Sequence, residues 1–121
     1  LQRTPLHWAC VEGQVDTMEI LLRGGATVEA RDYRGQTPLH HSCSMGHLRV
    51  SQLLVQRYHA DVSVTSNDLY RTPLHFASIG GNLEVVQFLL SLGADINALE
   101  KYGRAPIYFA SDLSVVSYLA V

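Results

Sequence analysis

TPLHWA (residues 4–9), TPLHHS (37–42) and TPLHFA (72–77) are three copies of one pattern, and APIYFA (105–110) is a degenerate fourth copy. The copies begin at positions 4, 37, 72 and 105, so they lie 33, 35 and 33 residues apart. A second set of similar segments follows the complete copies at the same offset: EGQV (12–15), MGHL (45–48) and GGNL (80–83). This period predicts a solenoid, in which each unit is stable only when it stacks on its neighbours.

Each unit is predicted to hold two short antiparallel helices and a loop. Thr followed by Pro starts the first helix, because the hydroxyl caps free N–H groups and Pro tolerates the first helical position. A glycine ends that helix, and apolar residues at helical spacing follow in the second. Gly25 and Gly93 stand where the second helix needs a left-handed residue to end.

A period of 33 residues that carries T-P-L-H-x-A resembles the ankyrin repeat, over essentially all 121 residues. The resemblance implies an all-α solenoid of stacked helix-turn-helix units, with β-hairpin-like loops that project as a row of fingers. We expect one domain, residues 1–121, with repeats near 1–31, 32–66, 67–99 and 100–121.

Composition indicates an ordinary globular chain, with 47% apolar and 17% charged residues. The net charge of −2 gives no general attraction to nucleic acid or to an anionic membrane. No apolar run approaches the ~20 residues of a membrane span. Two cysteines are too few for a disulfide scaffold and favour a reducing compartment, so we expect an intracellular protein, cytoplasmic or nuclear.

The segment 37–47 is dense in residues that bind zinc: His40, His41, Cys43 and His47. Three of them have counterparts of similar chemistry in the other repeats, which favours a structural role. In ankyrin repeats the histidine of TPLH resembles a structural bridge to neighbouring backbone. Only His41 is unexplained, and the residues at its position in the other repeats are flat rings: Trp8, Phe76 and Phe109. We therefore predict no metal and no other cofactor.

Neither a disulfide nor a catalytic site is predicted. Cys10 and Cys43 are one repeat apart, so their helices should lie ~8–10 Å from each other. A disulfide needs Cα atoms within ~7 Å, so both cysteines should be buried free thiols. The sequence contains no glycine-rich phosphate loop and no GxSxG motif, and we predict that the chain is not an enzyme.

Function is expected on the residues that do not repeat. In ankyrin proteins the recognising surface resembles a concave groove formed by the fingers and the first helix of each pair. Six of the nine basic residues fall on the predicted fingers, against three acids, and three tyrosines lie between them. Tyr with Arg is typical of interface hot spots. The predicted partner-binding residues are Tyr33, Arg34, Gln36, Met45, Leu69, Tyr70, Arg71, Ile79, Lys101, Tyr102 and Arg104.

This surface favours a protein or peptide partner of acidic character, and nucleic acid is disfavoured because the basic stripe is short. The alternative is a structural or regulatory segment of a larger enzyme, channel or scaffold. The sequence does not separate these, and it gives neither the partner's identity nor the oligomeric state.

Two extra residues interrupt the period between Thr37 and Thr72. One falls within Gln56–His59, and the other is expected near Thr65 and Ser66. Tyr70 stands where the sister fingers have Gly35 and Gly103, and a positive φ there would cost ~1–2 kcal/mol. We expect finger 66–71 to differ in shape, and we interpret Leu69, Tyr70 and Arg71 as a recognition element.

The fourth repeat lacks the capping Thr and three residues of the inter-helix turn. Either Asp112 caps a helix after a tight corner, or a segment is missing from the sequence.

Asn97 follows Asp95 and Ile96, with Leu89 upstream, which resembles the segment that asparagine-hydroxylating oxygenases accept in ankyrin repeats. The alternative is that Asn97 only shapes its loop.

Overall fold

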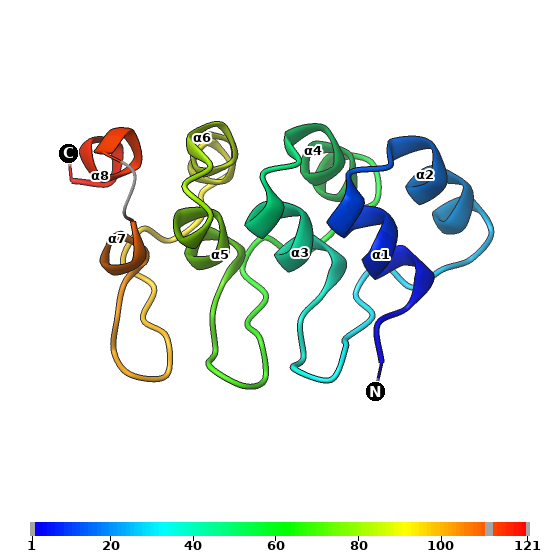
Figure 1. The fold of residues 1–121 in the computed structure, drawn as a ribbon, viewed down its shortest axis with the longest axis horizontal. Helices are drawn as coiled ribbons and strands as arrows, with labels where there is room; N and C mark the ends of the chain where they lie inside the picture. Colours follow the sequence, from blue (N-terminus) through cyan, green and yellow to red (C-terminus); the bar gives the residue numbers. More distant parts are fainter. Residues whose placement is uncertain (1, 111–112, 121) are drawn as a thin grey trace.

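Two layers of helices and a row of projecting loops make up the structure (Figure 1). The computed structural model describes residues 2–110 and 113–120, which contain eight helices and no strand. The inner layer holds α1 (Pro5–Glu12), α3 (Pro38–Met45), α5 (Pro73–Ile79) and α7 (Pro106–Phe109). The outer layer holds α2 (Val15–Arg23), α4 (Leu48–Gln56), α6 (Leu83–Ser91) and α8 (Leu113–Leu119). The predicted all-α solenoid is confirmed.

Threonine and histidine of TPLH cap each complete inner helix reciprocally. The Oγ1 atoms of Thr4, Thr37 and Thr72 accept the backbone N–H of the histidine three residues later. The histidine Nδ1 accepts the threonine N–H in return, at 3.0, 2.9 and 3.1 Å. Ala105 makes no side-chain cap, and α7 has only four residues. Loss of the cap is thus accompanied by a shorter helix.

The other nitrogen of each TPLH histidine joins neighbouring repeats. Since Nδ1 is an acceptor, Nε2 carries the proton and donates it to a carbonyl of the next loop. The Nε2 atoms of His7, His40 and His75 lie 2.9 Å from the carbonyl oxygens of Gln36, Val64 and Arg104. All three rings are fully buried. The predicted structural role of these histidines is confirmed.

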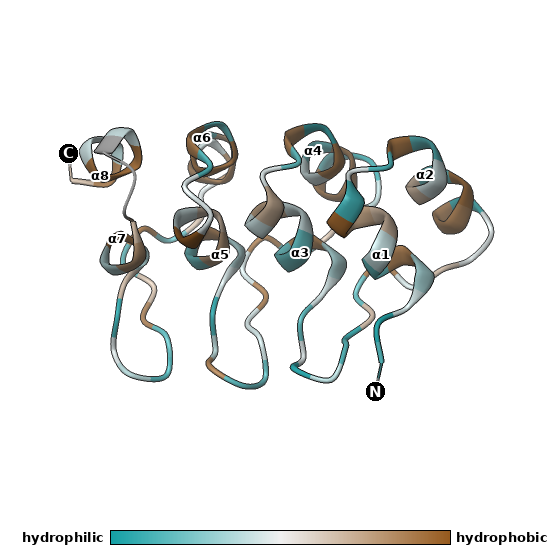
Figure 2. Cartoon of the chain, in the orientation of Figure 1, coloured by the Kyte–Doolittle hydropathy of each residue, from teal (hydrophilic) through white to brown (hydrophobic). Residues whose placement is uncertain are grey.

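Apolar residues fill the space between the two helix layers and between repeats. The inner helices contribute Leu6, Leu39 and Leu74, and the outer helices contribute residues such as Leu54 and Leu89. Hydrophobic colour is concentrated on the helices, whereas the loops are mostly hydrophilic (Figure 2). The loops still contribute apolar side chains to the core, since Val28, Val62 and Ile96 pack against it.

A second set of side chains bridges the repeats at the inter-helix turns. The Nε2 of His47 donates to the carbonyl oxygen of Val11 at 2.8 Å. Asn82, at the same position one repeat later, donates to the carbonyl oxygens of Cys43 and Ser44 at 2.8 and 3.0 Å. The predicted structural role of His47 is thereby confirmed.

The loops that we call fingers are each closed by one backbone hydrogen bond. The N–H of Asp32 donates to Gln36, that of Ser66 to Arg71 and that of Glu100 to Arg104. These bonds define the first finger (32–36), the central finger (66–71) and the last finger (100–104).

One extra residue of the second repeat lies at the end of α4, as predicted. The N–H of Ala60 donates to the carbonyl of Leu54, six residues back, whereas Ala26 donates to Leu21, five residues back. His59 takes the left-handed conformation there, with φ of +61°.

The other extra residue lies in the tip of the central finger, so its expected position near Thr65 and Ser66 is wrong. Ser66 makes the closing bond of its finger, as Asp32 does in the first finger. The tip turn of the first finger runs from the carbonyl of Asp32 to the N–H of Gly35, but that of the central finger runs from Ser66 to Tyr70. The irregular shape of finger 66–71 is confirmed, with an insertion among residues 67–69.

Asp112 lies outside the described residues, so its predicted capping role has no structural account. No described helix combines the length and hydrophobicity needed to cross a membrane.

Candidate functional site

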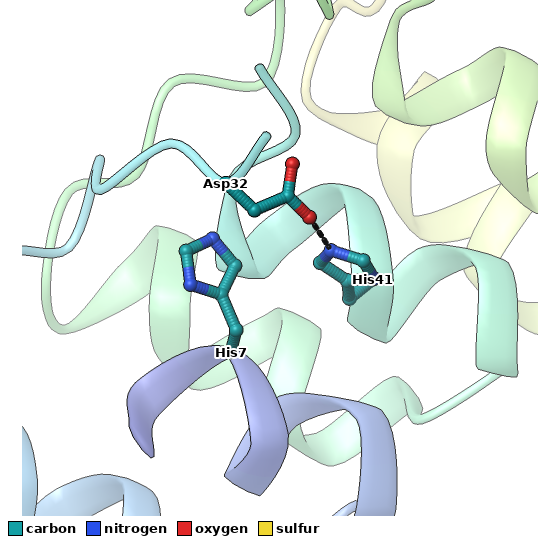
Figure 3. Close-up of side chains that lie close together, drawn as sticks. All are labelled: His7, Asp32 and His41. Atoms are coloured by element: carbon teal, nitrogen blue, oxygen red, sulfur yellow. Dashed lines mark hydrogen bonds and ion pairs between the residues drawn. The ribbon is translucent and has the colours of Figure 1, made fainter. Parts of the chain in front are cut away.

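His7, Asp32 and His41 come closest to a metal site among the described residues, since their ligand atoms lie within 4.8 Å of one another. Figure 3 shows the two rings, from α1 and α3, beside the Asp32 carboxylate. Both nitrogens of His7 already bond the backbone, to the Thr4 N–H and the Gln36 carbonyl. The Nε2 of His41 donates to the Asp32 Oδ2 at 2.8 Å. A metal would have to displace these bonds, so the cluster is built as a structural network.

The Asp32 carboxylate organises the first finger from within. Its Oδ1 accepts the backbone N–H groups of Arg34 and Gln36 at 3.0 and 2.9 Å. Burial raises the pKa of Asp32, but the hydrogen bonds from His41 and these two N–H groups together lower it below its ordinary value. Burial also lowers the pKa of His41, against the opposing effect of Asp32. Asp32 is therefore a buried, ionised carboxylate, although its position in the sequence predicts only an acid on a loop.

His41 occupies a ring position that recurs along the solenoid. Its ring stands edge-on to His7, with centroids 5.4 Å apart. Phe76 stands in the same way against His40, at 5.0 Å, and Phe109 against His75, at 5.9 Å. The interpretation of this site as one for flat rings is confirmed.

Cys10 and Cys43 are free and fully buried, as predicted. Burial raises the pKa of both thiols to about 12. Because a thiolate is the reactive form, neither sulfur is suited to nucleophilic chemistry.

Lowering the pH from 7.5 to 5 should reduce the free energy of unfolding by about 2 kcal/mol through His40 alone. Burial lowers the pKa of His40 to about 4 in the folded state, against an ordinary value of 6.5. At pH 5 the unfolded chain therefore binds a proton that the folded chain does not. Stability is lost as the pH falls from 6.5 towards 4 and regained above 6.5. Urea denaturation at both pH values measures the difference.

The control for this prediction is His40→Gln. This variant should be less stable at pH 7.5 and yet lose less further stability at pH 5. A pH dependence as steep as that of the wild type would contradict the assignment to His40.

Of the six basic residues predicted on the fingers, four are engaged within the chain, and two of these four, Arg3 and Arg31, lie outside the fingers as defined above. Arg31 donates to the carbonyls of Gly35 and Thr65 and to Asn67, at 2.8 to 3.3 Å. Arg3 lies 3.8 Å from Asp32. Arg71 and Arg104 both face the buried Glu100. These four cations therefore hold the fingers together.

Arg34 and Lys101 are the two finger cations without an ion pair or side-chain hydrogen bond in the part of the chain that the structure describes. Each is exposed and lies over its own tyrosine. The Arg34 guanidinium is 5.4 Å from the centroid of Tyr33, and the Lys101 ammonium is 5.7 Å from that of Tyr102. Glu100 and Asp32 are buried, so two of the three finger acids do not oppose these cations at the surface.

Exposed apolar side chains accompany these cations. On the fingers, the side chains of Tyr33, Tyr70 and Tyr102 are 63%, 54% and 64% exposed. Met45 and Ile79, the last residues of the inner helices α3 and α5, are 54% and 39% exposed. Leu69 is half-buried. The structure thus exposes the predicted tyrosines, Met45 and Ile79.

The remaining predicted site residues have structural partners. Gln36 receives the His7 hydrogen bond on its carbonyl and closes the first finger. Arg71 and Arg104 also lie over the Phe109 ring, at 4.7 and 4.9 Å from its centroid. Charge reversal at these two arginines would therefore damage the fold as well as any binding.

Trp8 and Tyr108 are exposed inner-helix rings that the sequence reasoning did not include in the site. Trp8 is 49% exposed, lies 4.9 Å from the Arg3 guanidinium and borders a shallow cavity with Tyr33. Tyr108 is 65% exposed and lies 5.0 Å from the Arg104 guanidinium. The available signal was the residue type, since Tyr108 replaces the histidine of TPLH and Trp8 is the one tryptophan of the sequence.

Asn97 lies exposed on the loop between α6 and the last finger. Its backbone N–H donates to the Asp95 Oδ1 at 2.9 Å, so the segment forms a small turn. Its hydroxylation stays a prediction.

Two family models match the chain, and both describe ankyrin repeats: one of three copies at residues 1–68, and one of many copies at residues 58–110. NF-kappa-B inhibitor alpha of Sus scrofa is 44% identical over 105 residues, which cover 83% of this chain and 33% of that protein. Transient receptor potential cation channel subfamily A member 1 of Drosophila melanogaster is 33% identical over 113 residues, 91% of this chain and 9% of the channel subunit. E3 ubiquitin-protein ligase XBAT33 of Arabidopsis thaliana is 33% identical over 117 residues, 94% of this chain and 23% of the ligase. The chain thus spans a third or less of the length of these relatives.

Proposed function

This chain belongs to the ankyrin-repeat family, and from that premise we propose that it is an interaction module that binds a protein or peptide partner of acidic character. Binding would take place on the fingers and the exposed ends of the inner helices. The observation that carries the proposal is the combination of exposed tyrosines with two unpaired cations on those fingers.

Aromatic and cationic side chains together suit a protein interface better than a nucleic acid. Tyrosine adds contact area at low entropic cost, and arginine pairs with carboxylates. Two free finger cations are few for a phosphate backbone, whose binding depends on many charge contacts. The proposal includes no catalysis, because the buried histidines and acids described above are occupied by structural hydrogen bonds. The buried free thiols favour an intracellular location.

A second candidate is a structural or regulatory segment of a larger protein. The observation that favours it is the similarity to a channel subunit and to a ubiquitin ligase of which the chain covers 9% and 23%. In that case the finger surface would contact another part of the same assembly.

Replacing Tyr70 by glycine should weaken partner binding at least tenfold without lowering stability. Tyr70 has φ of +54°, a conformation that costs a non-glycine residue ~1 kcal/mol, so glycine relieves strain while it removes the exposed ring. An aromatic anchor lost from an interface commonly costs ~2 kcal/mol. Affinity capture from cells that express the protein, with quantitative mass spectrometry, would identify the partner, and calorimetry with purified partner would give the affinity.

Two variants serve as matched controls. His59→Gly relieves a left-handed residue in the same way, but at the end of α4. Ile20→Ala removes a side chain that is 68% exposed on α2, in the outer layer. Both should keep wild-type affinity. If Tyr70→Gly, Tyr33→Ala and Tyr102→Ala all bound the partner with wild-type affinity, recognition by the fingers would be contradicted.

A further inference from the structure

The unpaired cations stand on the first and last fingers, with the central finger between them. Of the nine basic residues, six pair with an acid or with backbone carbonyls, and three have no such partner among the described residues: Arg34, Arg49 and Lys101. Arg49 lies on the outer helix α4. The finger surface therefore offers one cation at each side of its centre.

The central finger separates these cations by a surface of different character. Asp68 lies at its tip, half-buried, and its carboxylate accepts the Leu69 N–H at 2.7 Å. Tyr70 is exposed beside it. Across the three tips the order is therefore cation, then acid with an aromatic ring, then cation.

Backbone hydrogen bonds fix the order and spacing of the tips. The N–H groups of Asn67 and Asp68 both donate to the Arg34 carbonyl, at 3.0 and 3.3 Å. The N–H of Lys101 donates to the Leu69 carbonyl at 2.8 Å. The array is thus largely preorganised, which reduces the entropic cost of binding an extended ligand.

We infer that the partner segment is an extended peptide with two acidic side chains about five or six residues apart and an uncharged, apolar stretch between them. Neighbouring repeats lie about 8–10 Å apart, so Arg34 and Lys101, two repeats apart, are separated by about 16–20 Å. An extended chain advances about 3.3 Å per residue, so about five or six residues span that distance. One acid pairs with Arg34, the other with Lys101, and the stretch between them contacts Leu69 and Tyr70 while it avoids repulsion from Asp68. This inference rests on the proposed function.

The test is selection of a displayed library of random twelve-residue peptides on the wild-type chain. Enriched peptides should share two Asp or Glu residues separated by five or so uncharged positions. Synthesised and labelled for fluorescence anisotropy, they should bind Arg34→Glu/Lys101→Glu at least tenfold more weakly. Arg49→Glu, which reverses an exposed and unpaired cation outside the fingers, should bind them as the wild type does.

A charge swap adds a readout that general damage to the fold would not give. A peptide in which one acid is replaced by Lys should bind the wild type weakly and recover affinity on either Arg34→Glu or Lys101→Glu. The variant that restores binding also reports the direction in which the peptide lies.

The outcomes separate this inference from the proposed function. The inferred spacing would be overturned if the enriched peptides lacked paired acids. It would also be overturned if they bound both charge-reversal variants like the wild type but bound Tyr70→Gly more weakly. Recognition by the fingers would still stand in either case. If the peptides bound every finger variant like the wild type, or if no peptide were enriched, both the inference and the proposed function would be overturned. Single-stranded DNA that competes for the fingers at least as well as the peptides would overturn the peptide assignment.

Discussion

Replacing Gly35 by alanine is expected to reduce the free energy of unfolding by about 3 kcal/mol. Gly35 ends the tip turn of the first finger with φ of +72°, which costs any other residue ~1–2 kcal/mol. A Cβ atom there would also lie 2.6 Å from the backbone nitrogen of Asn67, and closer still to its side chain. That nitrogen is fixed by its bond to the Arg34 carbonyl, so the two fingers would have to separate. Urea denaturation measures the loss.

Gly103→Ala is the matched control for this prediction. Gly103 has the same place in the last finger and φ of +75°, but no atom lies within 4 Å of a Cβ built on it. This variant should therefore lose only about 1–2 kcal/mol, the backbone part of the effect. Equal losses at the two glycines would show that the contact between the first and central fingers does not contribute to stability.

The scaffold was predictable because its residues recur. Thr4, Thr37 and Thr72 precede Pro and His at one spacing, and local hydrogen bonds within three residues determine the cap that they form. Comparison of repeats also explained His41, since Phe76 and Phe109 occupy the same ring position. Repetition thus supplied the information that a single copy lacks.

The sequence positions of the charged residues did not predict which of them are buried or paired within the chain. Asp32 and Glu100 are two of the three acids that the sequence places on the fingers, yet both are buried at the base of their fingers. Arg71 meets Glu100 across two fingers, and this contact depends on the fold. The net surface charge of the fingers therefore depends on which arginines pair internally, and Arg34 and Lys101 emerged only from the geometry.

The position of the insertion was ambiguous for a similar reason. An extra residue between Thr65 and Tyr70 fits several alignments, because the segment contains no repeated residue to fix the register. The hydrogen bond from Ser66 to Arg71 resolves it by matching Ser66 to Asp32 and Glu100.

Glu100→Ala is expected to destabilise the protein by about 3 kcal/mol, at the lower end for a broken buried ion pair because Arg104 is partly exposed. The Glu100 Oε1 accepts the N–H groups of Tyr102 and Arg104, at 2.7 and 3.2 Å. Its Oε2 accepts the Arg104 Nη2 at 3.0 Å and lies 3.9 Å from the Arg71 Nε, which is buried and has no hydrogen-bond partner of its own. Alanine would leave these donors without their acceptor. Thermal and urea unfolding would measure the loss.

A control and a pH test separate this carboxylate from ordinary loop acids. Asp95→Ala removes an exposed acid that accepts one backbone N–H, and should cost under about 1 kcal/mol. The hydrogen bond from Arg104 lowers the pKa of Glu100 to about 2, from an ordinary 4.5, so its stabilisation is present above pH 4.5 and lost as the pH falls towards 2. Glu100→Gln should therefore flatten the stability profile between pH 4.5 and 2, whereas Asp95→Ala should not. If Glu100→Gln kept the wild-type dependence of stability on pH, groups other than Glu100 would hold the last finger. Those groups would then also position Lys101 and Tyr102.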